Sequence, residues 1–206
     1  MVIQIILFNG FDELDAIAPY EVLKRSNEIK DYFQVSLVTL DEQKEVKGFY
    51  GLKVNVDATI SVEKRPDMLI VPGGGWNHKG EQGARKEAER GVLPQIIKQF
   101  YEQGTIIGGV CTGGMLMAVC GITKGRTTTM HHLASKEMAA LGCEVIGARI
   151  VDDNKLLTAR GVTSGVDLAL WLIERFVGSD VAYAVEKRLE YERRGTVWRT
   201  SGTDSN

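Results

Sequence analysis

The sequence predicts an α/β fold in which a mainly parallel sheet is covered by helices on both faces. Apolar strands and helices alternate along the chain, which is the pattern of parallel sheets with crossover helices. Several of the strands are continuous apolar runs, as expected where both faces are buried. No internal repeat, linker or change of composition divides the chain. We therefore expect one domain over residues 1–200, with a loose polar tail that starts near Thr200 and covers 201–206.

The first half of the chain predicts strands, helices and one hairpin. Residues 2–8 are β-branched and apolar and end at Asn9-Gly10, which is typical of a buried strand. Apolar residues at helical spacing predict a helix over 13–25, with Pro19 inside the pattern. Further along we expect a strand at 34–40, a hairpin at 52–60 after a glycine-rich approach, a strand at 68–71 closed by Pro72-Gly-Gly-Gly75, and an amphipathic helix at 91–102 that Gly104 ends.

The second half begins with an apolar strand at 105–110 that runs directly into Cys111. The remaining expected elements are a helix at 115–119 stopped by Gly121, a strand at 126–129, a helix at 133–141 capped by Gly142, a hairpin of 145–151 and 156–159 around the turn residues Asp152-Asp153-Asn154, and helices at 164–176 and 181–192.

Composition excludes several classes of function. The net charge of −2 favours neither nucleic acid nor a membrane surface as a partner. The apolar start has no basic region or cleavage site, and no stretch reaches the roughly 18 apolar residues of a membrane helix, so we expect a cytoplasmic protein. The three cysteines form no CxxC pair and only three histidines are present, which argues against a disulfide framework and a zinc site. No metal or cofactor is expected.

Three segments whose side chains or backbone amides could take part in a reaction follow predicted strands. They are the acidic loop Asp12–Asp15, the glycines 73–75 and Cys111. Because ligands of open α/β sheets bind outside the carboxyl ends of the strands, we expect these segments to converge on one site.

Gly109-Val110-Cys111-Thr112-Gly113 has the form of a nucleophile elbow between a strand and a helix. Such a turn projects the nucleophile at the top of the sheet, and glycines leave room for it. The helix that follows is expected to lower the pKa of the thiol. The alternative is a buried structural cysteine. We favour Cys111 as a nucleophile, and we interpret Cys120 and Cys143 as packing residues.

Other residues at these strand ends have two interpretations each. The amides of Gly74 and Thr112 could bind an oxyanion, although the glycines could also form only a flexible turn. Asp15 could act as a general acid or base, or could serve as a helix-terminal charge, as could Asp12 and Glu13. His131 could supply a proton or be structural, and the neighbouring His132 leaves the assignment open.

Together these motifs resemble the ThiJ/PfpI superfamily, relatives of the class I glutamine amidotransferases that include the parkinsonism-associated deglycase. The resemblance also covers Gly125-Arg-Thr-Thr-Thr-Met-His131 and Gly161-Val-Thr-Ser-Gly-Val-Asp167. It implies a flavodoxin-like three-layer sandwich, a homodimer, and Cys111 as the nucleophile. It further implies that Asp15 lies against the sulfur, that His131 belongs to the site, and that the Gly74 and Thr112 amides form the oxyanion site.

Among the branches of the superfamily, the isocyanide hydratases are the most similar. Their motifs are D-x-x-G-P, C-T-G and T-T-H-W, and the matching segments here are Asp15-Ala-Ile-Ala-Pro19, Cys111-Thr-Gly113 and Thr129-Met-His131-His132. Ala18 replaces the Gly, Met130 replaces a Thr and His132 replaces the Trp of that pattern. Thr112 stands where the intracellular proteases have His, which argues against a peptidase. The same core occurs in AraC-type regulators, but the chain shows no helix-turn-helix extension.

The expected function is cysteine-dependent hydration of an isocyanide-like small electrophile to an N-formamide. Two alternatives remain. One is a glyoxalase or deglycase that acts on α-oxoaldehydes, and the other is a redox sensor whose thiol becomes a sulfinate.

Overall fold

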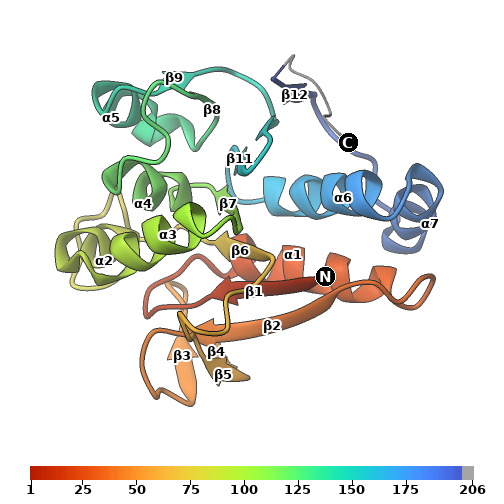
Figure 1. Ribbon diagram of the computed structural model, residues 1–206, viewed down its shortest axis with the longest axis horizontal. Helices are drawn as coiled ribbons and strands as arrows, with labels where there is room; N and C mark the ends of the chain where they lie inside the picture. Colours follow the sequence, from red (N-terminus) through yellow and green to blue (C-terminus); the bar gives the residue numbers. More distant parts are fainter. Residues whose placement is uncertain (201–206) are drawn as a thin grey trace.

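The computed structural model describes residues 1–200, and its centre is an eight-stranded sheet of order β12-β10-β11-β7-β6-β1-β2-β5 (Figure 1). Its strands are β1 (Val2–Ile6), β2 (Gln34–Thr39), β5 (Ala58–Thr59), β6 (Met68–Val71), β7 (Ile106–Val110), β10 (Ile150–Asp153), β11 (Leu156–Ala159) and β12 (Val197–Arg199). Two small sheets lie beside it: β3 (Glu45–Lys47) with β4 (Lys53–Asn55), and β8 (Thr127–Thr128) with β9 (Glu144–Val145).

The central sheet is parallel except for the hairpin of β10 and β11. The successive parallel strands β2, β1, β6, β7 and β11 stand in the order 2-1-3-4-5, which is the flavodoxin-like arrangement. Ile5 on β1, Ile70 on β6 and Ile107 on β7 have no exposed surface, in keeping with burial on both faces. The predicted mainly parallel sheet is confirmed, and the strand expected at 68–71 is found with the same bounds.

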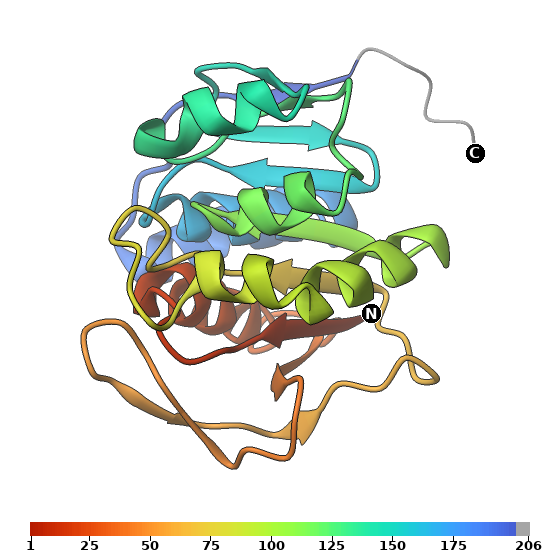
Figure 2. The ribbon, with the colours of Figure 1, turned by 90° about the vertical axis from the view of Figure 1, so that its left-hand side faces the viewer.

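Helices cover both faces of the sheet (Figure 2). The helices are α1 (Glu13–Ser26), α2 (Ala84–Arg90), α3 (Val92–Glu102), α4 (Gly113–Val119), α5 (Ser135–Ala140), α6 (Ser164–Phe176) and α7 (Ser179–Leu189), with a 3₁₀ turn η1 (His132–Ala134) before α5. α1, α6 and α7 contact one another on one face, and α2, α3 and α4 do so on the other. The three-layer sandwich is therefore confirmed. Within residues 1–200, no helix combines the length and apolar character needed to cross a bilayer.

Several peripheral elements differ from the sequence predictions. No hairpin forms within 52–60 as expected, because β4 pairs with β3, earlier in the chain, and β5 joins the main sheet beside β2. The strand expected at 145–151 is divided, because β9 pairs with β8 and β10 pairs with β11. The helix expected at 181–192 ends at Leu189, and α2 and β12 were not predicted at all. The strands β5, β9 and β12 pair with strands distant in sequence, which local patterns do not specify.

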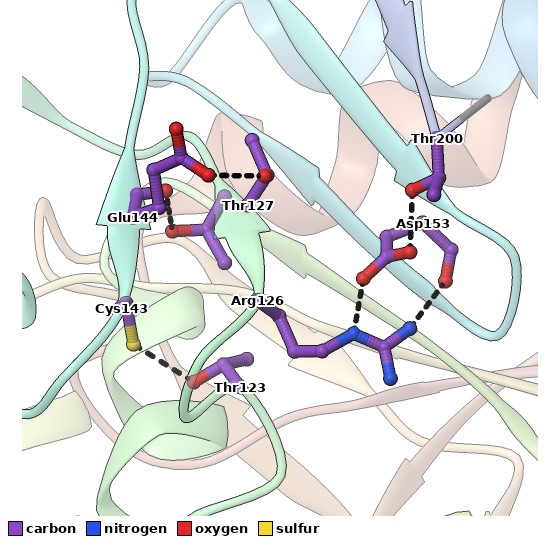
Figure 3. Close-up of polar contacts among 8 residues, drawn as sticks. Thr123, Arg126, Thr127, Cys143, Glu144, Asp153 and Thr200 are labelled. Carbon is purple, nitrogen blue, oxygen red and sulfur yellow. Dashed lines mark hydrogen bonds and ion pairs between the residues drawn. The ribbon is translucent and has the colours of Figure 1, made fainter.

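Polar contacts fasten the β8–β9 region and the end of the described chain to the sheet (Figure 3). Arg126 donates through Nε to the Asp153 carboxylate, and Thr200 donates to the same carboxylate at 2.5 Å. Thr200 is thus held in place, contrary to the expectation of a loose tail there, whereas 201–206 lie outside the described residues. Buried Cys143 faces Thr123, with 3.2 Å between its Sγ and Oγ1 of Thr123. This agrees with a packing role for Cys143.

Candidate active site

Cys111 occupies a tight elbow between β7 and α4. Its φ of 55° is in the left-handed region, which non-glycine residues rarely adopt, and its N–H donates to Ala159 O at 3.1 Å. The side chain is 6% exposed. The backbone can turn this tightly only because Gly113, two residues later, has no side chain. A Cβ atom at Gly113 would lie 2.0 Å from Val71 O. A strained backbone of this kind costs about 1–3 kcal/mol and is typical of functional sites.

Asp12 and Asp15, which both follow β1, make different contacts. Asp12 is the N-cap of α1 and accepts from the N–H of Leu14 at 3.2 Å. Asp15 lies one turn later and is fully buried, and its Oδ2 accepts from the N–H of Gly73 at 2.9 Å. Its Oδ1 is buried and has no close hydrogen-bond partner among residues 1–200. Asp15 is therefore not the helix cap, and one of its oxygens is free to exchange a proton.

Asp15 and Cys111 form a coupled pair. Burial raises the pKa of Asp15 well above its ordinary value, and the charge of Asp12 raises it further; the Gly73 amide and the nearby Cys111 thiol lower it only in part. Burial also raises the pKa of Cys111, with the charge of Asp15 as the next cause. The predicted lowering of the thiol pKa is therefore wrong, because the cost of burying a charge exceeds the help from nearby N–H groups. The buried pair favours sharing one proton.

Thr112 lies between the elbow and the glycine turn, which is formed by residues 73–75 after β6. Its Oγ1 accepts from the N–H of Gly74 at 3.1 Å. Gly74 has a φ of +111°, and a Cβ there would lie 2.3 Å from the Asp12 nitrogen, so only glycine fits. The Gly74 amide can reach an oxyanion only if Thr112 releases it. The oxyanion role of Gly74 stays a prediction.

Val162 is a site residue that the sequence did not reveal. It belongs to the turn between β11 and α6, and its backbone hydrogen bond favours the charged form of Cys111. Its φ of 31° is unusual for a β-branched side chain. No local signal could have indicated this, since Val is among the residues least suited to such a backbone.

A pocket of about 190 Å³ opens above the thiol. Its lining residues are Asp12, Phe49, Tyr50, Gly74, Gly75, Trp76, Asn77, His78, Cys111, Thr112, His131, Leu133 and Val162. Phe49, Tyr50, Trp76, Leu133 and Val162 give it an aromatic and aliphatic surface. The pocket therefore suits an apolar substituent carried by a group that reacts with the thiol.

His131, rather than His132, lines this pocket. Its Nδ1 accepts from the N–H of Leu133 at 3.3 Å, and its ring stacks on that of His132 with 4.6 Å between centroids. Burial lowers the pKa of His131, and the nearby charges of His132 and Arg160 lower it further. At neutral pH the imidazole is thus uncharged with its proton on Nε2, which can donate a hydrogen bond.

The outer wall of the pocket is a loop that sequence reasoning also missed. Phe49 and Tyr50 stand between β3 and β4 and are both exposed. Glu13 holds this loop, because its Oε1 accepts from the N–H of Tyr50 at 2.7 Å and from that of Leu52 at 3.3 Å. The acidic loop after β1 thus supplies the helix cap, the buried acid and the anchor of the pocket wall.

The chain is similar in sequence to a known protein family and to several known proteins. The model of the DJ-1/PfpI family matches residues 1–175. The isonitrile hydratase of Pseudomonas putida is 31% identical over 193 residues, covering 93% of this chain and 79% of that protein. The glutathione-independent glyoxalase DJR-1.2 of Caenorhabditis elegans is 25% identical over 180 residues, covering 86% and 89% of the two chains.

Solved structures share the fold at lower identity. The Schizosaccharomyces pombe DJ-1 structure has a TM-score of 0.78 and 22% identity and covers 93% of this chain and all of that one. An AraC family transcriptional regulator from Pseudomonas putida has a TM-score of 0.80 and 22% identity and covers 91% of this chain and 98% of the other. At these identities the structures establish the likeness of fold alone.

Proposed function

The chain belongs to the DJ-1/PfpI family, and we propose that it is a cysteine-dependent enzyme that hydrates an isocyanide-like small electrophile to an N-formamide. The observation that carries this proposal is the buried pair of Asp15 and Cys111 at the floor of an apolar pocket. An isocyanide needs a nucleophile and a proton delivered to the same carbon. A thiol and a carboxyl group that share one proton supply both.

In the first step, the proton of the pair resides on Asp15 and the Cys111 sulfur attacks the terminal carbon of the isocyanide. A C–S bond forms, and the carbon takes the proton from Asp15. The product is a neutral thioimidate, in which carbon is doubly bonded to the substrate nitrogen, and Asp15 is left as a carboxylate. The raised pKa of Asp15 favours this step, because burial makes the protonated form of the carboxyl group easier to reach than it is for an exposed aspartate.

In the second step, water adds across the C=N bond with Asp15 as the base. Oxygen bonds to carbon, and the nitrogen receives a proton. The C–S bond then breaks and releases the N-formamide, and the hydroxyl proton returns to Asp15. The sum is isocyanide plus water giving N-formamide, and the pair is restored. Thr112 and the Nε2–H of His131 are the groups we assign to orient the water and the adduct.

The sequence similarity to an isonitrile hydratase supports this choice. The similarity to the isonitrile hydratase extends over nearly the whole chain. The resemblance to the isocyanide hydratase branch, in turn, implies Asp15, Cys111 and Thr112 as its motif residues. A glyoxalase is the second candidate, because a relative of that activity is 25% identical. In that reaction the Cys111 thiolate would add to the aldehyde carbon of an α-oxoaldehyde to form a hemithioacetal.

The test is turnover of 4-nitrophenyl isocyanide and of methylglyoxal by the wild type, Cys111→Ala and the control Cys120→Ala. Cys120 is half-buried, and its Sγ donates to Met117 O at 3.2 Å, away from the pocket lining. Formamide production that Cys111→Ala abolishes and Cys120→Ala retains supports the hydratase. Lactate production that Cys111→Ala abolishes and Cys120→Ala retains supports the glyoxalase instead. Absence of both products, with a readily oxidised Cys111, leaves the sensor.

We also expect a homodimer, as the family resemblance implies. A hollow of about 260 Å³ between α1, α6 and the segment after α7 is lined mainly by apolar side chains, including Leu14, Ile17 and Leu189. Leu14 is 49% exposed there. Apolar surface of this kind marks interaction sites. Leu14→Glu should shift the mass measured by light scattering toward that of a monomer, and an unchanged mass would place the interface elsewhere.

A further inference from the structure

We propose that Trp76 determines the substrate preference of the Cys111 pocket and selects a neutral substrate with a planar apolar substituent. Arg85 and Glu137 act as positioning residues that hold the indole. The inference deepens the proposed function, since it names the substituent that accompanies the reactive carbon. It rests on three groups of contacts around Trp76 and on the charges near the pocket.

Trp76 is built into the pocket wall next to the glycine turn. It follows Gly74 and Gly75, which both have positive φ, and it is only 3% exposed although it lines the pocket with Cys111. A buried indole contributes a large flat surface with few rotatable bonds. It is thus the most rigid of the aromatic wall residues, since Phe49 and Tyr50 are exposed in a loop.

Arg85 and Glu137 contact Trp76 from two different helices. The indole Nε1 donates to Glu137 Oε2 at 2.8 Å, and Arg85 Nε donates to the Trp76 carbonyl at 2.7 Å. The Arg85 guanidinium also lies over the indole ring, with its Cζ 4.4 Å from the centroid. Arg85 donates to both carboxylate oxygens of Glu137, at 3.2 and 3.0 Å. Every polar group of this cluster is therefore paired, which fixes the ring.

The cluster also joins the two sides of the pocket. Arg85 is on α2, which follows the glycine turn, whereas Glu137 is on α5, which follows His131 and Leu133. A change at Glu137 would therefore loosen the indole and the adjacent wall without touching the thiol. Such a change should affect substrate binding more than the chemical step.

The charges near the pocket favour a neutral substrate. Among the described residues that line it, none is Lys or Arg. Arg85, next to Trp76, is neutralised by Glu137 and covers one face of the indole, and Arg160, whose charge acts on His131, is not among the lining residues. Asp12 and Asp15 are acids close to the reacting carbon. A carboxylate or phosphate on the substrate would meet no cation among the lining residues, whereas a flat apolar group meets the indole.

The test compares kcat/KM for 4-nitrophenyl isocyanide with that for methyl isocyanide. Trp76→Leu should lower the aryl-to-methyl ratio by about tenfold, the scale of a lost aromatic contact. Trp198→Leu is the matched control, because it removes the same side chain from β12, outside the pocket lining, and should keep the wild-type ratio. Glu137→Leu should raise KM for the aryl substrate with little change in kcat, and Glu137→Gln, which keeps an acceptor for Nε1, should restore it.

A ratio that Trp76→Leu leaves at the wild-type value overturns the inference. If the wild type turns over neither isocyanide, the proposed function fails, and the inference is then tested by binding. The probe is N-(4-nitrophenyl)formamide, titrated calorimetrically into Cys111→Ser with and without Trp76→Leu. About tenfold weaker binding in the double variant supports the role of Trp76. Equal affinity, or no binding to Cys111→Ser, overturns it.

Discussion

After burial itself, the charge of Asp15 is the strongest influence that raises the pKa of the Cys111 thiol. The two residues come from α1 and from the elbow after β7, and the fold brings them together at the carboxyl ends of β1 and β7, the two strands that flank β6. The relationship makes Asp15 more than a proton donor, because its protonation state sets that of the sulfur. It also means that the two residues cannot be assigned separate roles from sequence.

Asp15→Asn should therefore separate nucleophile reactivity from catalysis. Removal of the negative charge lowers the pKa of Cys111, so iodoacetamide should alkylate the thiol faster at pH 7.5 than in the wild type. Turnover should nevertheless fall by roughly 10²-fold or more, because the proton donor is lost. Rates of alkylation and of formamide production measure the two effects. Asp12→Asn is the control and should speed alkylation much less, because Asp12 contributes least among the groups that shift the pKa of Cys111.

The raised pKa of Asp15 also predicts how stability depends on pH. A carboxyl group whose pKa is higher in the folded state than in the unfolded chain keeps its proton in the folded state after the unfolded chain has lost it. The free energy of unfolding therefore falls as pH rises above the ordinary Asp pKa of about 4. The Cys111 thiol, whose pKa is also raised, adds a further fall above about pH 8.5 for the same reason.

Urea denaturation at pH 4.5 and pH 7.5 checks the Asp15 contribution. Asp15→Asn should reduce the loss of stability between these two values and should be more stable than the wild type at pH 7.5, by on the order of 1 kcal/mol. An identical pH dependence in both proteins would show that Asp15 titrates normally in the folded state.

Prediction from sequence succeeded where a residue's role is fixed by its immediate neighbours. The elbow at Cys111 follows from an apolar strand, a cysteine and the flanking Gly109 and Gly113, all adjacent in the chain. The three-layer fold follows from buried strands such as 68–71, whose apolar character is visible in four residues. Patterns of this kind predict structure well because both the local backbone and the tertiary packing require the same residues.

Prediction failed where tertiary contacts decide. The local pattern left Asp15 as either an acid or base or a helix-terminal charge, since the choice depends on the Gly73 amide that approaches from the end of β6. Tyr50 reaches the pocket because Glu13, far away in the sequence, accepts from its N–H. The thiol pKa was mispredicted because burial, which is not visible locally, outweighs the N–H groups that the elbow provides.

Strain at Val162 gives a third prediction. Its φ of 31° is costly for any side chain with a Cβ atom, and glycine removes that cost. Val162→Gly should therefore be more stable than Val162→Ala by about 1 kcal/mol, although glycine ordinarily destabilises relative to alanine. Chemical denaturation of the two variants measures the difference. A glycine variant that is the less stable of the pair would mean that the turn is relaxed.

The last prediction concerns the two consecutive glycines that open α4. A Cβ at Gly113 would lie 2.0 Å from Val71 O and 2.8 Å from the carbon of the same carbonyl, so the elbow and β6 would have to separate. Gly113→Ala should lower the free energy of unfolding by about 3 kcal/mol and displace Cys111 from Asp15, which would abolish turnover. The comparison variant is Gly114→Ala, where the nearest atoms to a Cβ are 3.8 Å or more away. That substitution should be tolerated, since it makes only ordinary contacts and alanine favours the helix. Thermal melting and turnover of both variants test the idea, which is contradicted if the two behave alike.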